Sequence, residues 1–127
     1  MRIKLCSVMV DDQEKALQFY TRVLGFIKKT EVPMGEHKWL TVVSPEAPDE
    51  VELVLEPLGF APARTFQQAL FAAGIPWTAF HVEDIQLEYE RLKAQGVVFS
   101  MPPTPMGPVT LAVFEDGCGN HLQIVQA

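Results

Sequence analysis

Hydrophobic and polar positions follow the same order twice along the chain. An alternating run at Ile3–Val10 leads through acidic residues into a stretch with apolar residues at helical spacing, which ends at Gly25. A second alternating run at Trp77–Val82 leads into a similar stretch that ends at Gly96. Alternation predicts strands, and a spacing of three to four residues predicts helices. The repeat therefore predicts two similar halves, each with a strand followed by a helix, that close around one shared cavity.

Both predicted helices carry start and stop signals. Asp11 stands three residues before Glu14, which is the spacing of a capping box, and Asp84 is predicted to cap the second helix. Gly25 and Gly96 are predicted to end the helices, because glycine readily adopts the left-handed conformation found there. The predicted buried faces are Ala16, Leu17, Tyr20, Val23 and Leu24 in the first helix, and Ile85, Tyr89 and Leu92 in the second.

Each predicted helix is followed by three further strand candidates. They cover residues 26–31, 38–43 and 51–56 in the first half and residues 97–101, 109–115 and 121–126 in the second. The proline-rich segment 102–108 is predicted to be a stiff connection, either a simple chain reversal or a rim or flap of the cavity. Residues 57–76 are predicted to connect the halves or to cover the cavity partly, with Phe66, Leu70 and Phe71 on a short helix.

Four of the strand candidates have one apolar face and one mixed face, because side chains alternate across a strand. The mixed faces are Leu5, Ser7 and Met9; Glu52, Val54 and Glu56; Trp77, Ala79 and His81; and His121, Gln123 and Val125. The apolar faces are predicted to carry the two helices, since this arrangement buries the most hydrocarbon. The mixed faces then line a concavity or else face solvent. The mixture of Trp, Met and Val with Glu, His and Gln favours the concavity.

The composition limits the classes of partner. The chain has 127 residues, one domain by size, and a net charge of −6 from 10 Lys and Arg against 16 Asp and Glu. An acidic chain without a basic run argues against nucleic acid and an anionic membrane surface as partners. No apolar stretch has the roughly 20 residues that cross a bilayer, and no signal peptide is expected. Cys6 and Cys118 are expected to be reduced thiols of a cytoplasmic protein, with a Cys118 nucleophile beside His121 as the alternative.

Three ordered motifs resemble the vicinal oxygen chelate superfamily, which includes glyoxalase, bleomycin-resistance proteins and extradiol dioxygenases. The motifs are 8–12 with 16–20 and 23–26, then 82–84 with 89–93 and 96–97, and finally 114–120 before a strand with Gln123-Ile124. The resemblance covers nearly the whole chain. It implies an α+β fold in which two βαβββ modules form a cupped, barrel-like mixed sheet with helices on the outside. The implied modules are 1–56 and 77–127, joined by the linker 57–76.

The resemblance also implies where a metal would be held. Members of the superfamily are commonly dimers, and many hold one divalent metal that stabilises an enediolate or oxyanion of the substrate. Carried over one at a time, the ligand positions fall at Leu5, Glu52, Trp77 and Gln123, with Glu56 as the alternative to Glu52. Leu5 and Trp77 cannot bind a metal, and a catalytic site usually needs about three protein ligands. The usual metal site is therefore predicted to be absent, and no cofactor is expected.

The predicted function is the binding of a small organic molecule in the sheet cup of a cytoplasmic homodimer. The predicted ligand-binding residues are Ser7, Met9, Glu52, Trp77 and Gln123, with Trp77 providing area for stacking. His81 and Glu56 are the candidate catalytic residues, because an imidazole or a carboxylate can act as a general base. The alternative function is that of a metal-dependent lyase, isomerase or dioxygenase with atypical ligands such as Glu56, His81 and Gln123.

Overall fold

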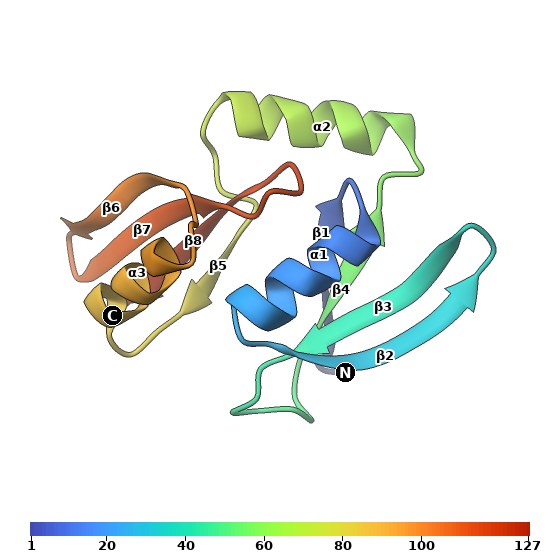
Figure 1. Cartoon of the computed structure of the whole chain (residues 1–127), viewed down its shortest axis with the longest axis horizontal. Coiled ribbons are helices and arrows are strands. Elements are labelled where there is room, and N and C mark those ends of the chain that lie inside the picture. The colour runs from blue at the N-terminus through green and yellow to red at the C-terminus, as the bar shows by residue number, and fades with distance from the viewer. The chain divides into compact units, whose positions relative to one another are not determined.

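The structure, a computed structural model, describes all residues 1–127 and divides into two compact units, Met1–Arg64 and Thr65–Ala127. Each unit contains its own four-stranded sheet. Figure 1 shows that a strand, a helix and three further strands follow one another in each unit. None of the helices combines the length and the apolar character that a membrane crossing requires.

Unit 1 builds a mixed sheet in the order β1-β4-β3-β2. Its elements are β1 (Leu5–Val10), α1 (Gln13–Gln18), the π-helical turn η1 (Phe19–Val23), β2 (Ile27–Met34), β3 (His37–Val43) and β4 (Glu52–Pro57). The strands β1 and β4 are parallel, and the other neighbours are antiparallel. The first and last strands of the unit therefore lie side by side.

Unit 2 repeats this topology with the sheet order β5-β8-β7-β6. Its elements are β5 (Thr78–His81), α3 (Ile85–Ala94), β6 (Phe99–Met106), β7 (Val109–Glu115) and β8 (His121–Gln126), and the helix α2 (Ala61–Ala72) carries the division between the units. The strands β5 and β8 are the parallel pair. The chain is an α+β protein of two βαβββ modules, as predicted, and the sheets form no closed barrel.

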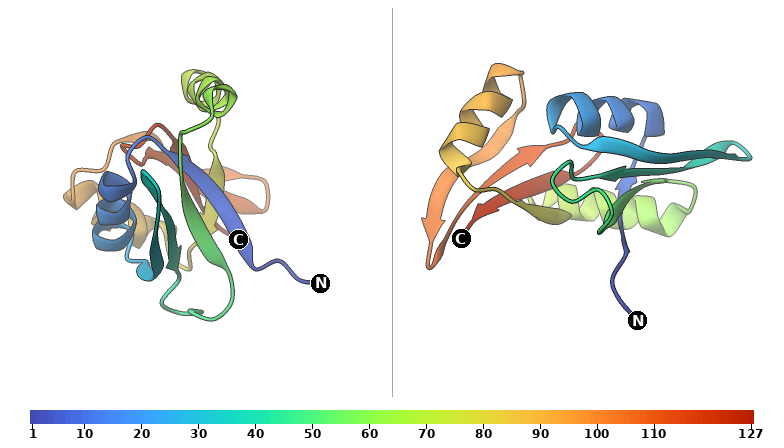
Figure 2. Two further views of the ribbon diagram at one scale, coloured as in Figure 1. Left: turned by 90° about the vertical axis from the view of Figure 1, so that its right-hand side faces the viewer. Right: turned by 90° about the horizontal axis from the view of Figure 1, so that it is seen from below.

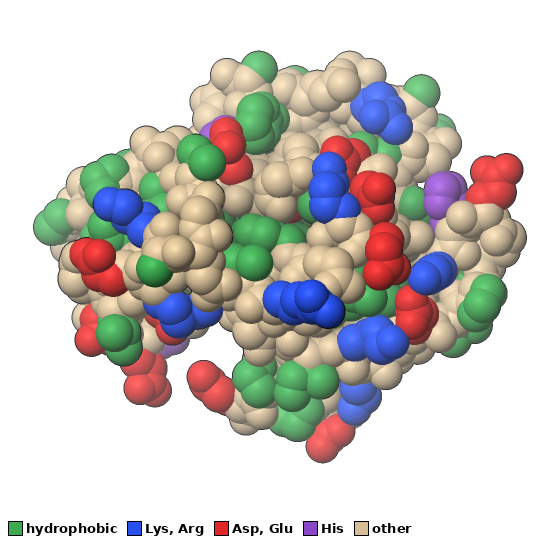
Figure 3. Space-filling view, viewed as in Figure 1, with side chains coloured by type: hydrophobic (Ala, Val, Ile, Leu, Met, Phe, Trp, Pro, Cys, Tyr) green, Lys and Arg blue, Asp and Glu red, His purple; other side chains and the backbone are tan.

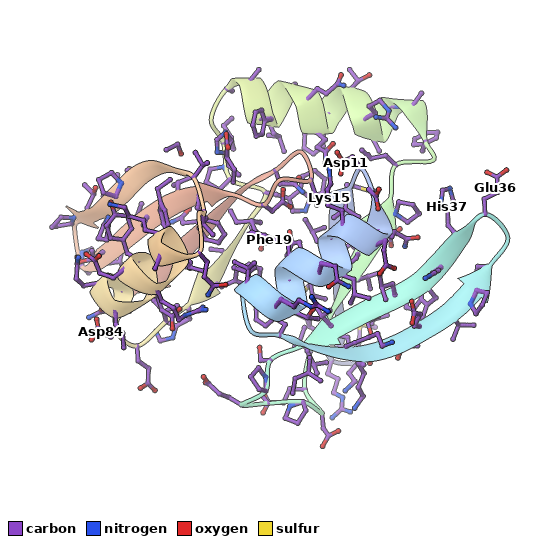
Figure 4. All side chains as sticks on the ribbon, in the orientation of Figure 1. Asp11, Lys15, Phe19, Glu36, His37 and Asp84 are labelled. Atoms are coloured by element: carbon purple, nitrogen blue, oxygen red, sulfur yellow. The ribbon has the colours of Figure 1, made fainter.

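The helix signals in the sequence are confirmed with one change. Asp12, and not Asp11, caps α1, because its side chain accepts a hydrogen bond from the Lys15 N–H at 3.0 Å. Asp11 instead pairs with the Lys15 ammonium group at 3.0 Å, at the start of the helix (Figure 4). Asp84 caps α3 as predicted, accepting from the Leu87 N–H at 3.0 Å.

The helix ends also follow the prediction. Gly25 and Gly96 have φ values of 89° and 86°, which is the left-handed region where glycine avoids strain. The first helix does not stay regular up to Gly25, since its last turn is the π-helical η1. In that turn the Leu24 N–H bonds to the Phe19 carbonyl at 3.1 Å, five residues back.

The helices cover the apolar strand faces, as predicted. In unit 1, α1 lies along one face of the sheet (Figure 2) and contacts β3 and β4. In unit 2, α3 contacts β6, β7 and β8. The buried apolar residues of the two cores include Val8, Val10, Ala16, Tyr20, Leu40, Val42 and Leu55 in unit 1, and Ile85, Leu92, Ala112, Phe114, Leu122 and Ile124 in unit 2. Burial of this hydrocarbon stabilises each unit.

Two segments between the predicted elements differ from expectation. The proline-rich segment 102–108 is not a separate connection, because β6 continues to Met106 and the chain reverses at Gly107-Pro108. Prolines are tolerated here because β6 is an edge strand, and the pairing shifts register twice along it. The predicted linker contains α2, a helix of 12 residues. The buried residue of this helix is Gln67, whereas Phe66 and Phe71, predicted as part of its apolar face, are exposed.

A glutamine side chain completes the sheet of unit 1. Continuing the register of β3 and β4 would set Lys38 opposite Pro57, which has no N–H to donate. The Gln13 amide enters at this point: its Nε2 donates to the carbonyls of Lys38 and Leu55 at 2.8 and 2.9 Å, and its Oε1 accepts from the Lys38 N–H at 3.0 Å. Gln13 thus bridges the backbones of β3 and β4 beyond the point where their direct pairing ends.

Candidate functional site

The predicted site residues of unit 1 share one face of the sheet. In the parallel pairing of β1 with β4, Leu5 lies opposite Glu52, Ser7 opposite Val54 and Met9 opposite Glu56. Leu5 and Ser7 are exposed, whereas the side chains of the neighbouring positions Val8 and Val10 point into the core. The structure therefore brings Ser7, Met9, Glu52 and Glu56 onto two adjacent strands, on the face opposite α1.

The two carboxylates on this face have different partners. Glu52 Oε1 accepts a hydrogen bond of 2.8 Å from the hydroxyl of Thr41, a fully buried residue of β3. Glu56 Oε1 accepts a longer bond of 3.4 Å from the Ser7 hydroxyl. The two glutamates are four positions apart along β4, or about 13 Å at the usual rise. This spacing sets them apart as two local groups, one anchored to β3 and one to β1.

The predicted site residues of unit 2 also share a face. Trp77 stands just before β5, and its backbone N–H donates to the His121 carbonyl at 2.8 Å. Ala79 lies opposite Gln123, and His81 lies opposite Val125. His81 is exposed, whereas Trp77 and Gln123 are half-buried. Trp77, His81 and Gln123 therefore lie on the face of the sheet opposite α3.

Aromatic residues of α2 contact this face. The Phe66 and Trp77 rings form an edge-to-face pair with centroids 5.7 Å apart, and the Phe71 ring stacks on the His121 imidazole at 4.4 Å with an angle of 19° between the planes. Such geometries are the favoured ones for aromatic pairs. The segment 57–76, predicted as a connection or a partial cover, thus contributes aromatic side chains that lie against the mixed face within unit 2.

A turn of buried polar groups fixes α2 in this position. The Asp116 carboxylate accepts from the backbone N–H groups of Cys118 and Asn120 at 2.7 and 3.0 Å and from the Asn120 side chain at 2.8 Å. Gln67 Nε2 donates to the Cys118 carbonyl at 3.3 Å and to Asn120 Oδ1 at 3.2 Å. Since these residues are buried, their hydrogen bonds are expensive to break.

The repeat relates the two mixed faces residue by residue. If Leu5 corresponds to Trp77, then Glu52, opposite Leu5, corresponds to His121, whose carbonyl receives the Trp77 N–H. The same register matches Gln123 with Val54. Glu52 and Gln123 are therefore not equivalent positions, although the resemblance assigned both to metal ligands.

Four polar residues with structural roles were not among the predicted site residues, namely Gln13, Thr41, Gln67 and Asp116. The partners of Gln13, Thr41 and Gln67 come from other elements of the chain, so composition and spacing carry no signal for these contacts, whereas Asp116 binds groups of its own turn. The internal repeat does carry a signal for another position, because it relates His121 to Glu52 once the strand register is known. The alternative role of Cys118 as a nucleophile does not fit, because Cys118 is fully buried in the turn.

The strongest electrostatic perturbation lies away from the predicted site. Hydrogen bonds from Lys28 and Lys38 lower the pKa of Glu31 from 4.5 to about 2, and the same pairing raises the pKa of Lys38. Lys28 and Glu31 lie on β2 and Lys38 lies on the neighbouring strand β3. Figure 3 shows basic and acidic side chains interspersed over this part of unit 1. No group of three or more His, Cys, Asp or Glu side chains is arranged to hold a metal ion.

Comparison with known proteins agrees with this architecture. The sequence profile of the Glyoxalase/Bleomycin resistance protein/Dioxygenase superfamily matches residues 2–124. The uncharacterized protein YurT of Bacillus subtilis (strain 168) is 54% identical over 126 residues, covering 99% of both chains.

Two solved structures extend the comparison. The structure of UcmS2 superposes with a TM-score of 0.86 at 32% identity, over 100% of this chain and 98% of its own. That of TnmS3, an antibiotic binding protein from Streptomyces sp. CB03234, superposes with a TM-score of 0.76 at 27% identity, over 99% and 95%. The chain belongs to the glyoxalase/bleomycin resistance protein/dioxygenase superfamily.

Proposed function

We propose that this protein binds a small organic molecule and sequesters it without metal-dependent chemistry. The proposal rests on the chemistry of the mixed faces: leucine and indole side chains, Leu5 and Trp77, stand at positions that the family resemblance assigns to metal ligands. Neither side chain offers a lone pair to a metal. Polar groups beside them, such as Glu52 and Gln123, are suited to orient an organic ligand.

The structural relatives support the same class of function. TnmS3 is an antibiotic binding protein and shares the fold over almost the full length of both chains. In this proposal, the ligand-contacting residues of the mixed faces are Ser7, Met9 and Glu52 in unit 1, and Trp77 and Gln123 in unit 2. Glu56 and His81 orient polar groups of the ligand, and the working form is a cytoplasmic homodimer without a cofactor.

Binding is tested by thermal shift with bleomycin and a panel of polycyclic aromatic antibiotics. A ligand present at 100 times its Kd stabilises the folded state by about 2.7 kcal/mol, so a true ligand raises the Tm in proportion to the logarithm of its concentration. Gln123→Ala should weaken binding severalfold, whereas Gln86→Ala, an exposed glutamine of α3, should not change it. If no compound of the panel raises the Tm, the proposal is wrong.

Sequestration is separated from catalysis by the fate of the ligand. After incubation with one equivalent of protein, the bound compound should be recovered chemically unchanged, as judged by mass spectrometry. Protein purified without chelator and then supplied with nickel, zinc, manganese or iron should retain less than a tenth of an equivalent of metal. Conversion of the compound, together with about one equivalent of bound metal, would establish a metal-dependent enzyme instead.

A further inference from the structure

The imidazole of His121 is buried with an unused hydrogen-bonding atom. Only 7% of the surface of His121 is exposed to solvent, and its Nδ1 is buried without a hydrogen-bond partner. Buried polar atoms are almost always paired, because an unpaired one loses its hydration without compensation. An atom of this kind is therefore a candidate for a partner supplied from outside the chain.

The repeat explains why the chain itself supplies no partner. In unit 1, Glu52 is opposite Val43, and the hydroxyl that reaches it belongs to Thr41, two residues earlier in β3. In unit 2, His121 is opposite Glu115, and the position that matches Thr41 is Val113. A valine offers no hydroxyl, so the hydrogen bond present in unit 1 is absent in unit 2.

The ring that covers His121 is able to move while its helix stays in place. Phe71 lies on the imidazole with 4.4 Å between ring centroids, yet 37% of its surface remains exposed. Rotation of this side chain needs no change of the core. The helix itself is held by the buried Gln67, through Cys118 and Asn120. Phe71 thus forms a side-chain cover on a fixed backbone.

We propose that His121 is the hydrogen-bonding centre of a ligand site in unit 2, and that a planar aromatic ligand with a hydroxyl or N–H group binds there by replacing the Phe71 ring. The ligand ring takes over the stacking position, so the exchange of one ring for another changes the stacking little. The polar group of the ligand supplies the partner that Nδ1 lacks. Phe66 and Trp77, in edge-to-face contact, border the same place. The inference rests on the proposed small-molecule binding and names the chemical class of the ligand.

The test uses 2-naphthol, a planar ring system with one hydroxyl group, and naphthalene as its counterpart without the hydroxyl. Dissociation constants are measured by titration calorimetry on the full chain and on three variants. His121→Phe should raise the Kd of 2-naphthol about tenfold and leave that of naphthalene unchanged, since one hydrogen bond is worth roughly a factor of ten. Phe71→Ala should lower both constants about threefold or more, because the competing ring is gone. The matched control is Phe60→Ala, an exposed phenylalanine of unit 1, which should change neither constant.

A second measurement uses the unaltered protein, so the result does not depend on the folding of a variant. The imidazole ¹⁵Nδ1 resonance of His121 should shift on addition of 2-naphthol and remain in place with naphthalene, while His37 and His81, both exposed, serve as references. The inference is overturned by any of three results: an Nδ1 resonance that does not move on addition of 2-naphthol, a Kd of 2-naphthol that is the same in His121→Phe as in the unaltered protein, or no binding of 2-naphthol at all. If antibiotics from the panel still raise the Tm in that case, small-molecule binding stands and only this site is wrong.

Discussion

The Gln13 amide provides the sharpest test of how the unit 1 sheet is held together. Replacing it in Gln13→Leu keeps a side chain of similar length and removes three hydrogen bonds, all between 2.8 and 3.0 Å. A typical protein hydrogen bond contributes about 1 kcal/mol net. Because Gln13 is half-buried and water can reach part of the gap, we expect a loss of about 2 kcal/mol instead of the full 3.

The assays are thermal unfolding and urea unfolding, both followed by circular dichroism at 222 nm. A loss of this size lowers the Tm by roughly 6 to 10 °C in a chain of this length, with an unchanged urea dependence of the unfolding free energy. Gln18→Leu is the matched control, since Gln18 is an exposed residue of the same helix, and it should stay within about 0.5 kcal/mol of the unaltered protein. Equal stability of the two variants would show that the bridge between β3 and β4 carries no energy.

Two further predictions concern the pH dependence of unit 1 and the end of its helix. Glu31 has a folded pKa of about 2, below its ordinary 4.5, so its pairing with Lys28 and Lys38 stabilises the fold above pH 4.5 and this contribution is lost as the pH falls toward 2. The unfolding free energies of the unaltered protein and of Glu31→Gln should therefore converge over that range, and a constant difference would contradict the pairing. Gly25→Ala should cost about 1 to 2 kcal/mol, because φ is 89° although the new Cβ meets no atom within 4 Å. Gly59→Ala, where φ is not positive, should cost less than 0.5 kcal/mol in the same denaturation series, and equal losses would remove the backbone explanation.

The features that the sequence predicted well are local ones. A carboxylate before each helix, a glycine after it and alternation along the strands depend on neighbours within a few residues. The repeat of these signals at Asp84 and Gly96 was enough to predict two modules of the same topology. The sequence does not distinguish Asp11 from Asp12 as the cap, because either aspartate could precede the first helical turn. The structure places the cap at Asp12, since α1 begins at Gln13.

The features that the sequence did not predict depend on contacts between distant segments. Gln67 looks like a solvent-facing residue of an amphipathic helix until the turn with Cys118 and Asn120 is placed beside it. The course of β6 through three prolines likewise depends on its position at the sheet edge, where missing N–H groups are tolerated. Strand register, which relates His121 to Glu52, also becomes available only from the folded chain.

The contact between Gln67 and Gly119 links the evolution of two positions that lie far apart in the chain. A Cβ on residue 119 would stand 2.8 Å from Oε1 of Gln67, closer than atoms tolerate. A larger residue at 119 would also be strained by the φ of 100°, and it would require the Gln67 amide to move away or a shorter residue to stand at 67, with loss of the contacts that this amide makes to the turn. In an alignment, relatives that keep both Gln67 and Gly119 would be those in which α2 is bound to the turn at Cys118 and Asn120 in the same way.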